Sequence, residues 1–288
     1  MTVSESSGSV GRSAAFFDID KTLVPGSSLY PLARRLRHEG VLGTGDAVRF
    51  AASQLVFRGG GRERRGAAEL ARRKALAFVA GRNRDELRSW ARAVVSESLL
   101  PHVYPAMEAR IRSHREAGEP VWLLTASPLE LAEILAEGLG ATGALGTEVE
   151  VDDAGVCTGR LAGPLLHGQP KADAVVALAA SERLDLSRVS AYSDSVHDLP
   201  LLSLVGRPHA VNPDTALRRH ARRHGWPVVE LRRGRRAVVR AGVSTLAGSA
   251  VAGGGVAVVV AGRRTRTRPS GRDGRPQRRR RPREAWAR

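Results

Sequence analysis

The chain has 288 residues, of which 42% are hydrophobic, enough for a large buried core. Its formal net charge of +17 is uneven: residues 31–100 carry +8, residues 231–288 carry +15, and the remainder carries −6. With one cysteine, Cys157, an intrachain disulfide and a cysteine-based zinc site are excluded. One free cysteine fits a reducing, cytoplasmic compartment. Residues 1–13 lack the apolar stretch of a secretory signal, and we expect them to be a disordered lead.

Short apolar runs without alternation predict strands that are buried on both faces, as in a parallel sheet. Three such runs occur, at 14–18, 121–124 and 189–192, and shorter strands are expected at 209–211 and 228–231. Helical patterns lie between them, at 28–39, 104–116, 128–139, 171–183 and from 198 onward. Two β-rich runs, 145–151 and 156–161, flank the sequence Asp-Asp-Ala-Gly and predict a β-hairpin.

Residues 31–100 have no strand-like run and alternate Arg-rich with Ala/Leu-rich stretches at helical spacing. The glycine triplet at 59–61 follows no strand, so we interpret it as a turn between helices and not as a phosphate loop. The sequence therefore predicts an α/β fold: a Rossmann-like open, mainly parallel sheet with helices on both faces and a helical cap inserted after the first strand. The expected core is 14–30 with 101–231, and the expected cap is 31–100.

Polar residues follow each of the three long apolar runs, where the carboxyl ends of parallel strands would bring them together. These residues are Asp18 and Asp20, Thr125 and Ser127, and Asp194 and Asp198. Any single aspartate here could be a helix cap, but three clusters at strand ends favour a site. Carboxylates without His or Cys suit Mg²⁺, which commonly accompanies a phosphate. One carboxylate can attack phosphorus, and another two residues on faces the same side and can transfer protons.

The ordered motifs resemble the haloacid dehalogenase superfamily over about 14–230. FFDIDKTL (16–23) resembles motif I, DxDx(T/V), and LLTAS (123–127) resembles motif II. Lys171 fits motif III, and YSDSVHD (192–198) resembles motif IV, with acids four apart. The long helical insert between motifs I and II is similar to subfamily IB, the phosphoserine-phosphatase-like group.

The resemblance implies roles for six residues. Asp18 would be the nucleophile and Asp20 the general acid and base. Mg²⁺ would be held by the Asp18 carboxylate, the Asp20 backbone carbonyl and Asp194, with Asp198 in support. Thr125 and Lys171 would bind the phosphoryl group.

Some residues around these motifs have simpler interpretations. Thr125 could be a helix N-cap, and Lys171 a solvated residue at a helix start. A lysine there is unfavourable to the helix dipole, however, and only three lysines occur in this arginine-rich chain. Lys21 is given no role, and His197 is interpreted as a loop residue and not as a ligand.

The expected reaction is Mg²⁺-dependent hydrolysis of a small phosphorylated metabolite through an aspartyl-phosphate. Phosphoserine phosphatases have a Glu nine residues after the nucleophile that meets the substrate ammonium, and here that position is Ser27. Phosphoserine is therefore disfavoured, though not excluded. Two alternatives stay open: an inactive scaffold that binds nucleic acid or anionic lipid through a basic tail, and a phosphotransferase of the same superfamily.

The C-terminal residues lie outside the resemblance. Residues 232–262 form an apolar, Gly-rich segment, in which 241–262 carry no charge and reach the roughly 20 residues needed to span a bilayer. Six of those 22 residues are glycine, so their average apolarity is marginal. Residues 263–288 carry 12 Arg against 2 acids, as disordered tails do. We expect partial association of 241–288 with an anionic membrane surface, and nucleic acid is the less favoured partner.

Overall fold

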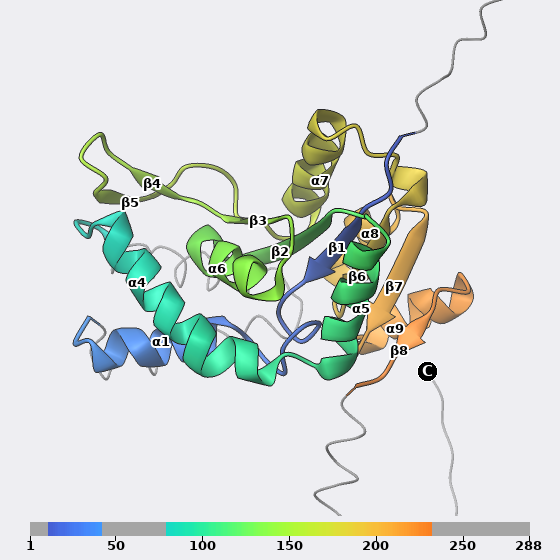
Figure 1. Cartoon of the computed structure of the whole chain (residues 1–288), viewed down its shortest axis with the longest axis horizontal. Helices are drawn as coiled ribbons and strands as arrows, with labels where there is room; N and C mark the ends of the chain where they lie inside the picture. The colour runs from blue at the N-terminus through green and yellow to red at the C-terminus, as the bar shows by residue number, and fades with distance from the viewer. Residues whose placement is uncertain (1–10, 42–78, 232–288) are drawn as a thin grey trace, which may run out of the picture. The chain divides into compact units, whose positions relative to one another are not determined.

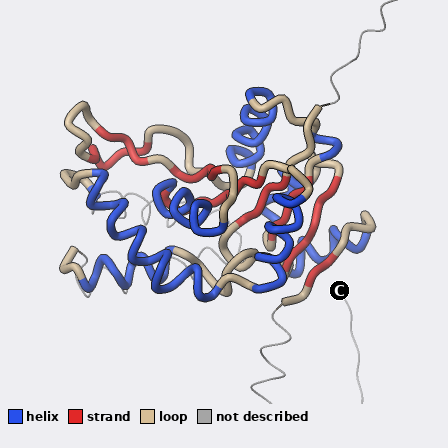
Figure 2. Tube along the Cα trace, viewed as in Figure 1, coloured by secondary structure: helices blue, strands red, loops and turns tan. Residues whose placement is uncertain are grey.

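The computed structural model describes residues 11–41 and 79–231, which belong to one compact unit. A six-stranded sheet with the strand order β3-β2-β1-β6-β7-β8 forms its centre, and every neighbouring pair of these strands is parallel (Figures 1 and 2). The strands are β1 (Ala15–Asp18), β2 (Val121–Pro128), β3 (Gly143–Thr147), β6 (Ser190–Ser193), β7 (Arg207–Val211) and β8 (Val228–Val229). The expected open, parallel α/β sheet is confirmed.

Helices cover both faces of the sheet because alternate residues of its central strands point to opposite sides. On β1, Ala15 and Phe17 belong to one hydrophobic cluster and Phe16 to another, and all three are fully buried. The first cluster includes residues of α5 (Pro105–Glu116) and α6 (Leu129–Leu139). The second includes residues of α7 (Gln169–Ser181), α8 (Leu199–Leu202) and α9 (Thr215–Arg223). Burial on both faces explains why β1 is an unbroken apolar run.

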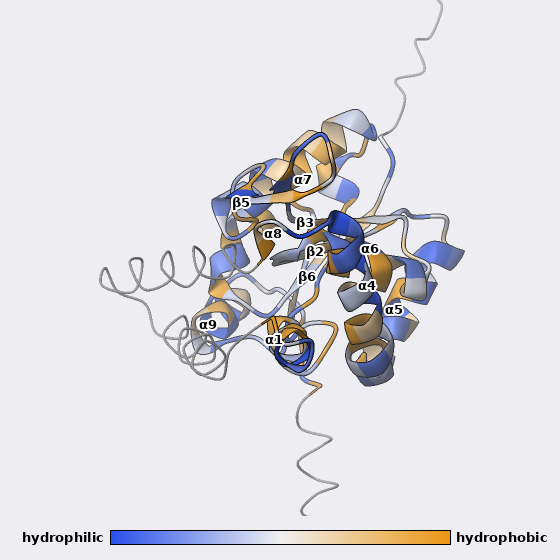
Figure 3. Cartoon of the chain, turned by 90° about the vertical axis from the view of Figure 1, so that its left-hand side faces the viewer, coloured by the Kyte–Doolittle hydropathy of each residue, from blue (hydrophilic) through white to orange (hydrophobic). Residues whose placement is uncertain are grey.

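The described part of the predicted cap is helical. It consists of α1 (Leu29–His38) and α4 (Arg84–Val94), and α4 continues into a π-helical turn (Val95–Leu99) and a 3₁₀ turn (Leu100–His102). In Figure 3, α1 and α4 each carry hydrophobic and hydrophilic residues, as amphipathic helices do. Asn83 caps α4 by accepting a hydrogen bond from the backbone N–H of Asp85.

The two ends of this insertion meet at the edge of the core. The backbone N–H of Tyr104 donates a 2.8 Å hydrogen bond to the carbonyl of Leu23. Tyr104 precedes α5, and Leu23 lies on the loop that leads from β1 to α1. The chain therefore leaves the sheet and returns to it at adjacent points.

The expected hairpin forms, but the predicted bounds of its first strand, 145–151, were wrong. Residues 143–147 make the edge strand β3 of the main sheet, parallel to β2, and only β4 (Val149–Val151) pairs with β5 (Cys157–Leu161) in an antiparallel hairpin. Glycine explains the difference, because a Cβ at Gly146 would lie 2.6 Å from the Leu129 Cα of α6. The hairpin packs with α4 through a cluster that contains Leu87, Trp90 and Cys157.

Several element boundaries also differ from the sequence-based expectation. Pro128 ends β2 and precedes α6, whereas we expected it inside the first helical turn. Asp198 ends a 3₁₀ turn (Val196–Asp198) and is the N-cap residue of α8, so the helix expected from 198 onward begins one residue later. Pro128 pairs with Thr147 of β3, and Asp198 accepts a hydrogen bond from Ser193. The local sequence does not reveal either contact.

Some predictions fall on residues outside the described ranges. These are most of the lead at 1–13, the glycine triplet at 59–61 with the helices expected around it, the apolar segment at 232–262 and the tail at 263–288. Within 11–41 and 79–231, no helix combines the length and apolarity that crossing a bilayer requires.

Candidate active site

The candidate site lies where the strand order of the sheet reverses. Strands β1, β2 and β3 run outward in one direction, and the chain then returns to place β6 against the other side of β1. In open α/β sheets, ligands bind at such a switch point, beyond the carboxyl ends of the strands. Asp18 is the last residue of β1, and Asp194 directly follows β6. The topology thus brings together two aspartates that are 176 positions apart in the sequence.

Lys171 links the nucleophile candidate to motif IV. It lies in the first turn of α7, is only 2% exposed, and its ammonium Nζ donates to Asp18 Oδ1 at 2.6 Å and to Asp198 Oδ2 at 2.8 Å. Ser193 also donates to Asp198 Oδ2, at 2.7 Å. The interpretation of Lys171 as a solvated residue is wrong, because its side chain is buried. A buried ammonium is stable only when it is paired, and the two carboxylates provide that pairing.

Burial and neighbouring charges shift the pKa values of Asp18, Lys171 and Asp198. Burial raises the pKa of Asp18 to about 8, with the nearby carboxylates of Asp198 and Asp194 adding to the rise and Lys171 opposing it. Burial by itself would raise the pKa of Asp198, but the ion pair with Lys171 and the hydrogen bond from Ser193 bring it below its usual value. For Lys171, the two carboxylates outweigh burial and raise the pKa, so the lysine is charged. The cluster therefore holds more negative than positive charge when all its members ionise.

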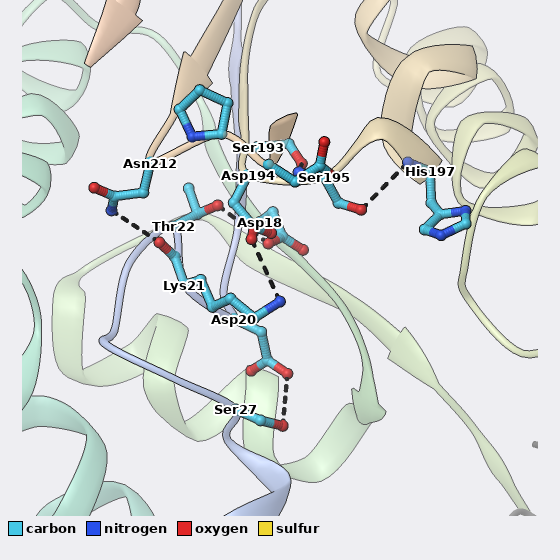
Figure 4. A network of polar contacts seen from close by, with 12 residues as sticks. Asp18, Asp20, Lys21, Thr22, Ser27, Ser193, Asp194, Ser195, His197 and Asn212 are labelled. Carbon is cyan, nitrogen blue, oxygen red and sulfur yellow. Dashed lines mark hydrogen bonds and ion pairs between the residues drawn. The ribbon is translucent and has the colours of Figure 1, made fainter. Parts of the chain in front are cut away.

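Lys21 faces Asp194 on the other side of the site. Its Nζ lies 3.4 Å from Asp194 Oδ2, and its side chain is 33% exposed (Figure 4). The backbone of Lys21 has a φ of +62°, and Asn212 holds this strained conformation by donating a 3.0 Å hydrogen bond to the Lys21 carbonyl. No role was expected for Lys21 or Asn212 from their place in the sequence, and only the fold reveals that they meet.

Asp20 does not join the Lys171 cluster. Its carboxylate accepts a 3.1 Å hydrogen bond from the Ser27 hydroxyl (Figure 4). It also accepts a 2.8 Å hydrogen bond from the Ser28 backbone N–H, at the start of α1. Asp18 and Asp20 were expected to face the same side of an extended chain, but the chain leaves β1 after Asp18 and turns. The Asp20 carboxylate therefore lies beside the start of α1, the first helix of the cap.

Thr125 lies inside β2, in the stretch between Leu124 and Pro128 where the strand register shifts, and is 1% exposed; its hydroxyl accepts a 3.0 Å hydrogen bond from the backbone N–H of Ser127. It therefore supports the irregular part of β2 instead of capping α6, which has no side-chain cap. Ser127 in turn shares a 2.8 Å hydrogen bond with Ser28. This contact joins the end of β2 to the residue before α1.

Sequence reasoning missed two residues that hold the acids. Thr22, fully buried, donates to Asp18 Oδ2 at 3.2 Å, and Ser193 donates to Asp198. Thr22 is the last residue of the DxDx(T/V) pattern, so the motif contained its signal. Ser193 had no such signal. His197 is exposed and its backbone N–H donates to the Ser195 hydroxyl; it lies in the 3₁₀ turn Val196–Asp198 and not in a loop.

The donor set fits a hard divalent cation. Asp18 and Asp194 supply carboxylate oxygens at the switch point, and the excess negative charge described above would be offset by a cation. Within the described residues, no three His, Cys, Asp or Glu side chains are arranged as a metal site. The Mg²⁺ ligands expected from the family resemblance include only two carboxylates, those of Asp18 and Asp194, because the third ligand is the Asp20 backbone carbonyl.

These features define the class of protein. The chain belongs to the haloacid dehalogenase-like hydrolase family, whose model matches residues 15–203. The expected family, sheet and enzyme class, a hydrolase, are confirmed.

Particular relatives extend this result. The chain is 43% identical over 253 residues to phosphoserine phosphatase SerB1 of Mycobacterium tuberculosis, an alignment that spans 88% of this chain and 82% of that protein. It is 34% identical over 222 residues to a probable phosphatase of the same organism, across 77% of this chain and 76% of the relative. A crystal structure of a protein of unknown function from Bordetella pertussis Tohama I matches with a TM-score of 0.67 and 32% identity, covering 77% of this chain and 99% of that one.

Proposed function

We propose that this chain is a Mg²⁺-dependent phosphatase that hydrolyses a small phosphate monoester through an aspartyl-phosphate on Asp18. The observation that carries the proposal is the buried ammonium of Lys171, 2.6 Å from Asp18 at the switch point of the sheet. A lysine in that place balances the charge of the carboxylate and can also hold a phosphoryl oxygen. The alternative of an inactive binding scaffold has less support, because every acid and the lysine of the four motifs are present.

In the first step, a carboxylate oxygen of Asp18 attacks phosphorus, a bond forms between them, and the bond from phosphorus to the leaving oxygen breaks. Asp20, protonated, gives its proton to that leaving oxygen, so a neutral alcohol departs. Lys171 and the Thr125 hydroxyl would hold phosphoryl oxygens. Bound Mg²⁺, held by the Asp18 carboxylate, the Asp20 carbonyl and Asp194, would supply charge stabilisation for the transferring phosphoryl group.

In the second step, the carboxylate of Asp20 takes a proton from a water molecule whose oxygen attacks phosphorus. The bond between phosphorus and the Asp18 oxygen breaks, which releases inorganic phosphate and restores the Asp18 carboxylate. Asp198 would act through Lys171, whose ammonium it holds at 2.8 Å. Asp198 is thus a positioning residue in this scheme, whereas the family resemblance implies that it supports the Mg²⁺ site.

Two observations bear on the substrate and point in different directions. The relative named phosphoserine phosphatase shares 43% identity with this chain. Ser27, however, stands where a Glu was expected for an ammonium group, and its hydroxyl is engaged with Asp20. We therefore propose a small phosphorylated metabolite without assigning phosphoserine, and we expect another ester to be turned over faster.

A panel of phosphorylated metabolites, assayed with Mg²⁺ and with EDTA, tests the proposal. Phosphate release should require Mg²⁺, and Asp18→Asn should abolish both turnover and the acid-stable aspartyl-phosphate label. Asp153→Asn, an exposed aspartate in the turn of the hairpin, is the matched control and should retain activity. Near-native turnover by Asp18→Asn would refute the covalent mechanism, and a clear preference for phosphoserine would refute the substrate prediction.

A further inference from the structure

The carboxylate of Asp20 is held by two consecutive residues at the entrance to α1. Ser27 Oγ donates to Oδ2 at 3.1 Å (Figure 4), and the backbone N–H of Ser28 donates to Oδ1 at 2.8 Å. Each oxygen of the carboxylate therefore has a separate donor. The two contacts together fix both the position and the rotation of the carboxylate plane.

The backbone around Ser27 is itself fixed. Gly26 has a φ of +119°, a conformation that favours glycine, and its carbonyl accepts a 2.9 Å hydrogen bond from the backbone N–H of Lys21. The carbonyl of Ser27 accepts from the backbone N–H of Tyr30 at 3.2 Å. Ser28 is fully buried and shares a hydrogen bond with Ser127. The turn thus holds the Ser27 hydroxyl toward Asp20.

The two donors differ in a way that matters for proton transfer. A backbone N–H can only donate, so the contact from Ser28 always leaves Oδ1 an acceptor. A serine hydroxyl can rotate and either donate to a carboxylate or accept from a carboxylic acid. Asp20 must pass through both forms in one catalytic cycle, and Ser27 is a partner that suits both.

We propose that Ser27 is a positioning residue for proton transfer: its hydroxyl orients Asp20 in both the protonated and the ionised state and does not contact the substrate's leaving group. This inference rests on the proposed function, since it takes Asp20 to be the general acid and base. It gives position 27 a role in the chemistry of both steps, in place of the recognition of a substrate ammonium.

The test compares Ser27→Ala with Ser27→Thr in the full chain with Mg²⁺. The substrates are ethyl phosphate, whose alkoxide must be protonated to leave, and 4-nitrophenyl phosphate, whose phenolate leaves without a proton. Ser27→Ala should lower kcat about tenfold for ethyl phosphate and about threefold for 4-nitrophenyl phosphate, with KM nearly unchanged. Ser27→Thr, which keeps a hydroxyl, should remain within about twofold of wild type for both.

Controls separate this effect from loss of structure. Ser181→Ala removes an exposed hydroxyl at the end of α7 and should change neither rate nor melting temperature. If Ser27→Ala does not fold, Ser27→Cys offers a similar volume with a much weaker donor and is compared in the same way.

Three results would overturn the inference: an unchanged kcat in Ser27→Ala, an equal loss for both esters accompanied by a raised KM, or a failure of Ser27→Thr to restore the rate. Asp20→Asn distinguishes these from failure of the proposed function. If Asp20→Asn keeps wild-type activity, the acid–base assignment of Asp20 is itself wrong. If Asp20→Asn is inactive while Ser27→Ala matches wild type, only the role of Ser27 is refuted.

Discussion

Lys171→Met offers a direct test of the charge balance in the candidate site. The substitution removes an ammonium that contacts two buried carboxylates, Asp18 at 2.6 Å and Asp198 at 2.8 Å. Removing one partner of a buried ion pair leaves uncompensated charge and costs about 3–5 kcal/mol. We expect a loss of that size in the free energy of unfolding at pH 7.5, together with a fall in kcat of about a thousandfold or more.

The loss of stability in Lys171→Met should depend on pH. Without the ammonium, the pKa values of Asp18 and Asp198 rise in the folded state, so the folded protein binds more protons than the unfolded chain. A group whose folded pKa is raised contributes stability at low pH that is lost as pH rises. The difference between Lys171→Met and wild type should therefore be smaller at pH 5 than at pH 8.

Urea denaturation in EDTA at both pH values, monitored by circular dichroism, measures this difference. Lys21→Met is the matched control, because Lys21 is 33% exposed and its pair with Asp194 spans 3.4 Å, so about 0–1 kcal/mol is expected. A loss below about 1 kcal/mol in Lys171→Met, or a loss independent of pH, would show that the buried carboxylates do not depend on this lysine.

Three further predictions concern the metal, acid stability and the C-terminus. Asp194→Ala should raise the Mg²⁺ concentration needed for half-maximal activity, and full activity in EDTA would remove the metal from the mechanism. Burial lowers the pKa of His209 from 6.5 to about 4, so stability should fall as pH drops through this range, where the unfolded chain binds the additional proton. Because His209 is partly exposed, we expect about 1–2 kcal/mol, and His209→Phe, which keeps the stacking on Tyr192, should lose this part of the pH dependence in urea titrations. Truncation after Arg233 should keep activity and abolish sedimentation with anionic liposomes at low salt; a full-length chain that does not sediment would refute membrane attachment.

The sheet was largely predictable because its signal is local. A parallel strand that is buried on both faces is typically apolar throughout, and the apolar runs in β1 and in the first half of β2 indicate such strands. Strand β6, SAYS, is equally buried although two of its four residues are serine. The edge strand β3 was misassigned to the hairpin, because its sequence, GALGT, is neither strongly apolar nor alternating. Its place depends on the absence of side chains at Gly143 and Gly146, which lets it approach Trp122 and Leu129.

The sequence identified the residues of the candidate site but not the hydrogen-bond partners of each residue. Ordered motifs identified Asp18, Lys171 and Asp198, and the fold brings them within hydrogen-bond distance. The partners of Asp20 were not predictable, because the turn that contains Gly26 decides where Ser27 points. Contacts across the sheet, such as that between Asn212 and Lys21, link residues whose proximity no local pattern encodes.

The backbone hydrogen bond between Tyr104 and Leu23 has an evolutionary consequence. Because the insertion leaves and rejoins the core at neighbouring points, its length can change without moving any strand of the sheet. The core would then be able to accept exchanged or enlarged insertions while its catalytic groups stay in place. Specificity and chemistry could in this way diversify separately, one by replacing the inserted segment and the other by point substitutions at the strand ends.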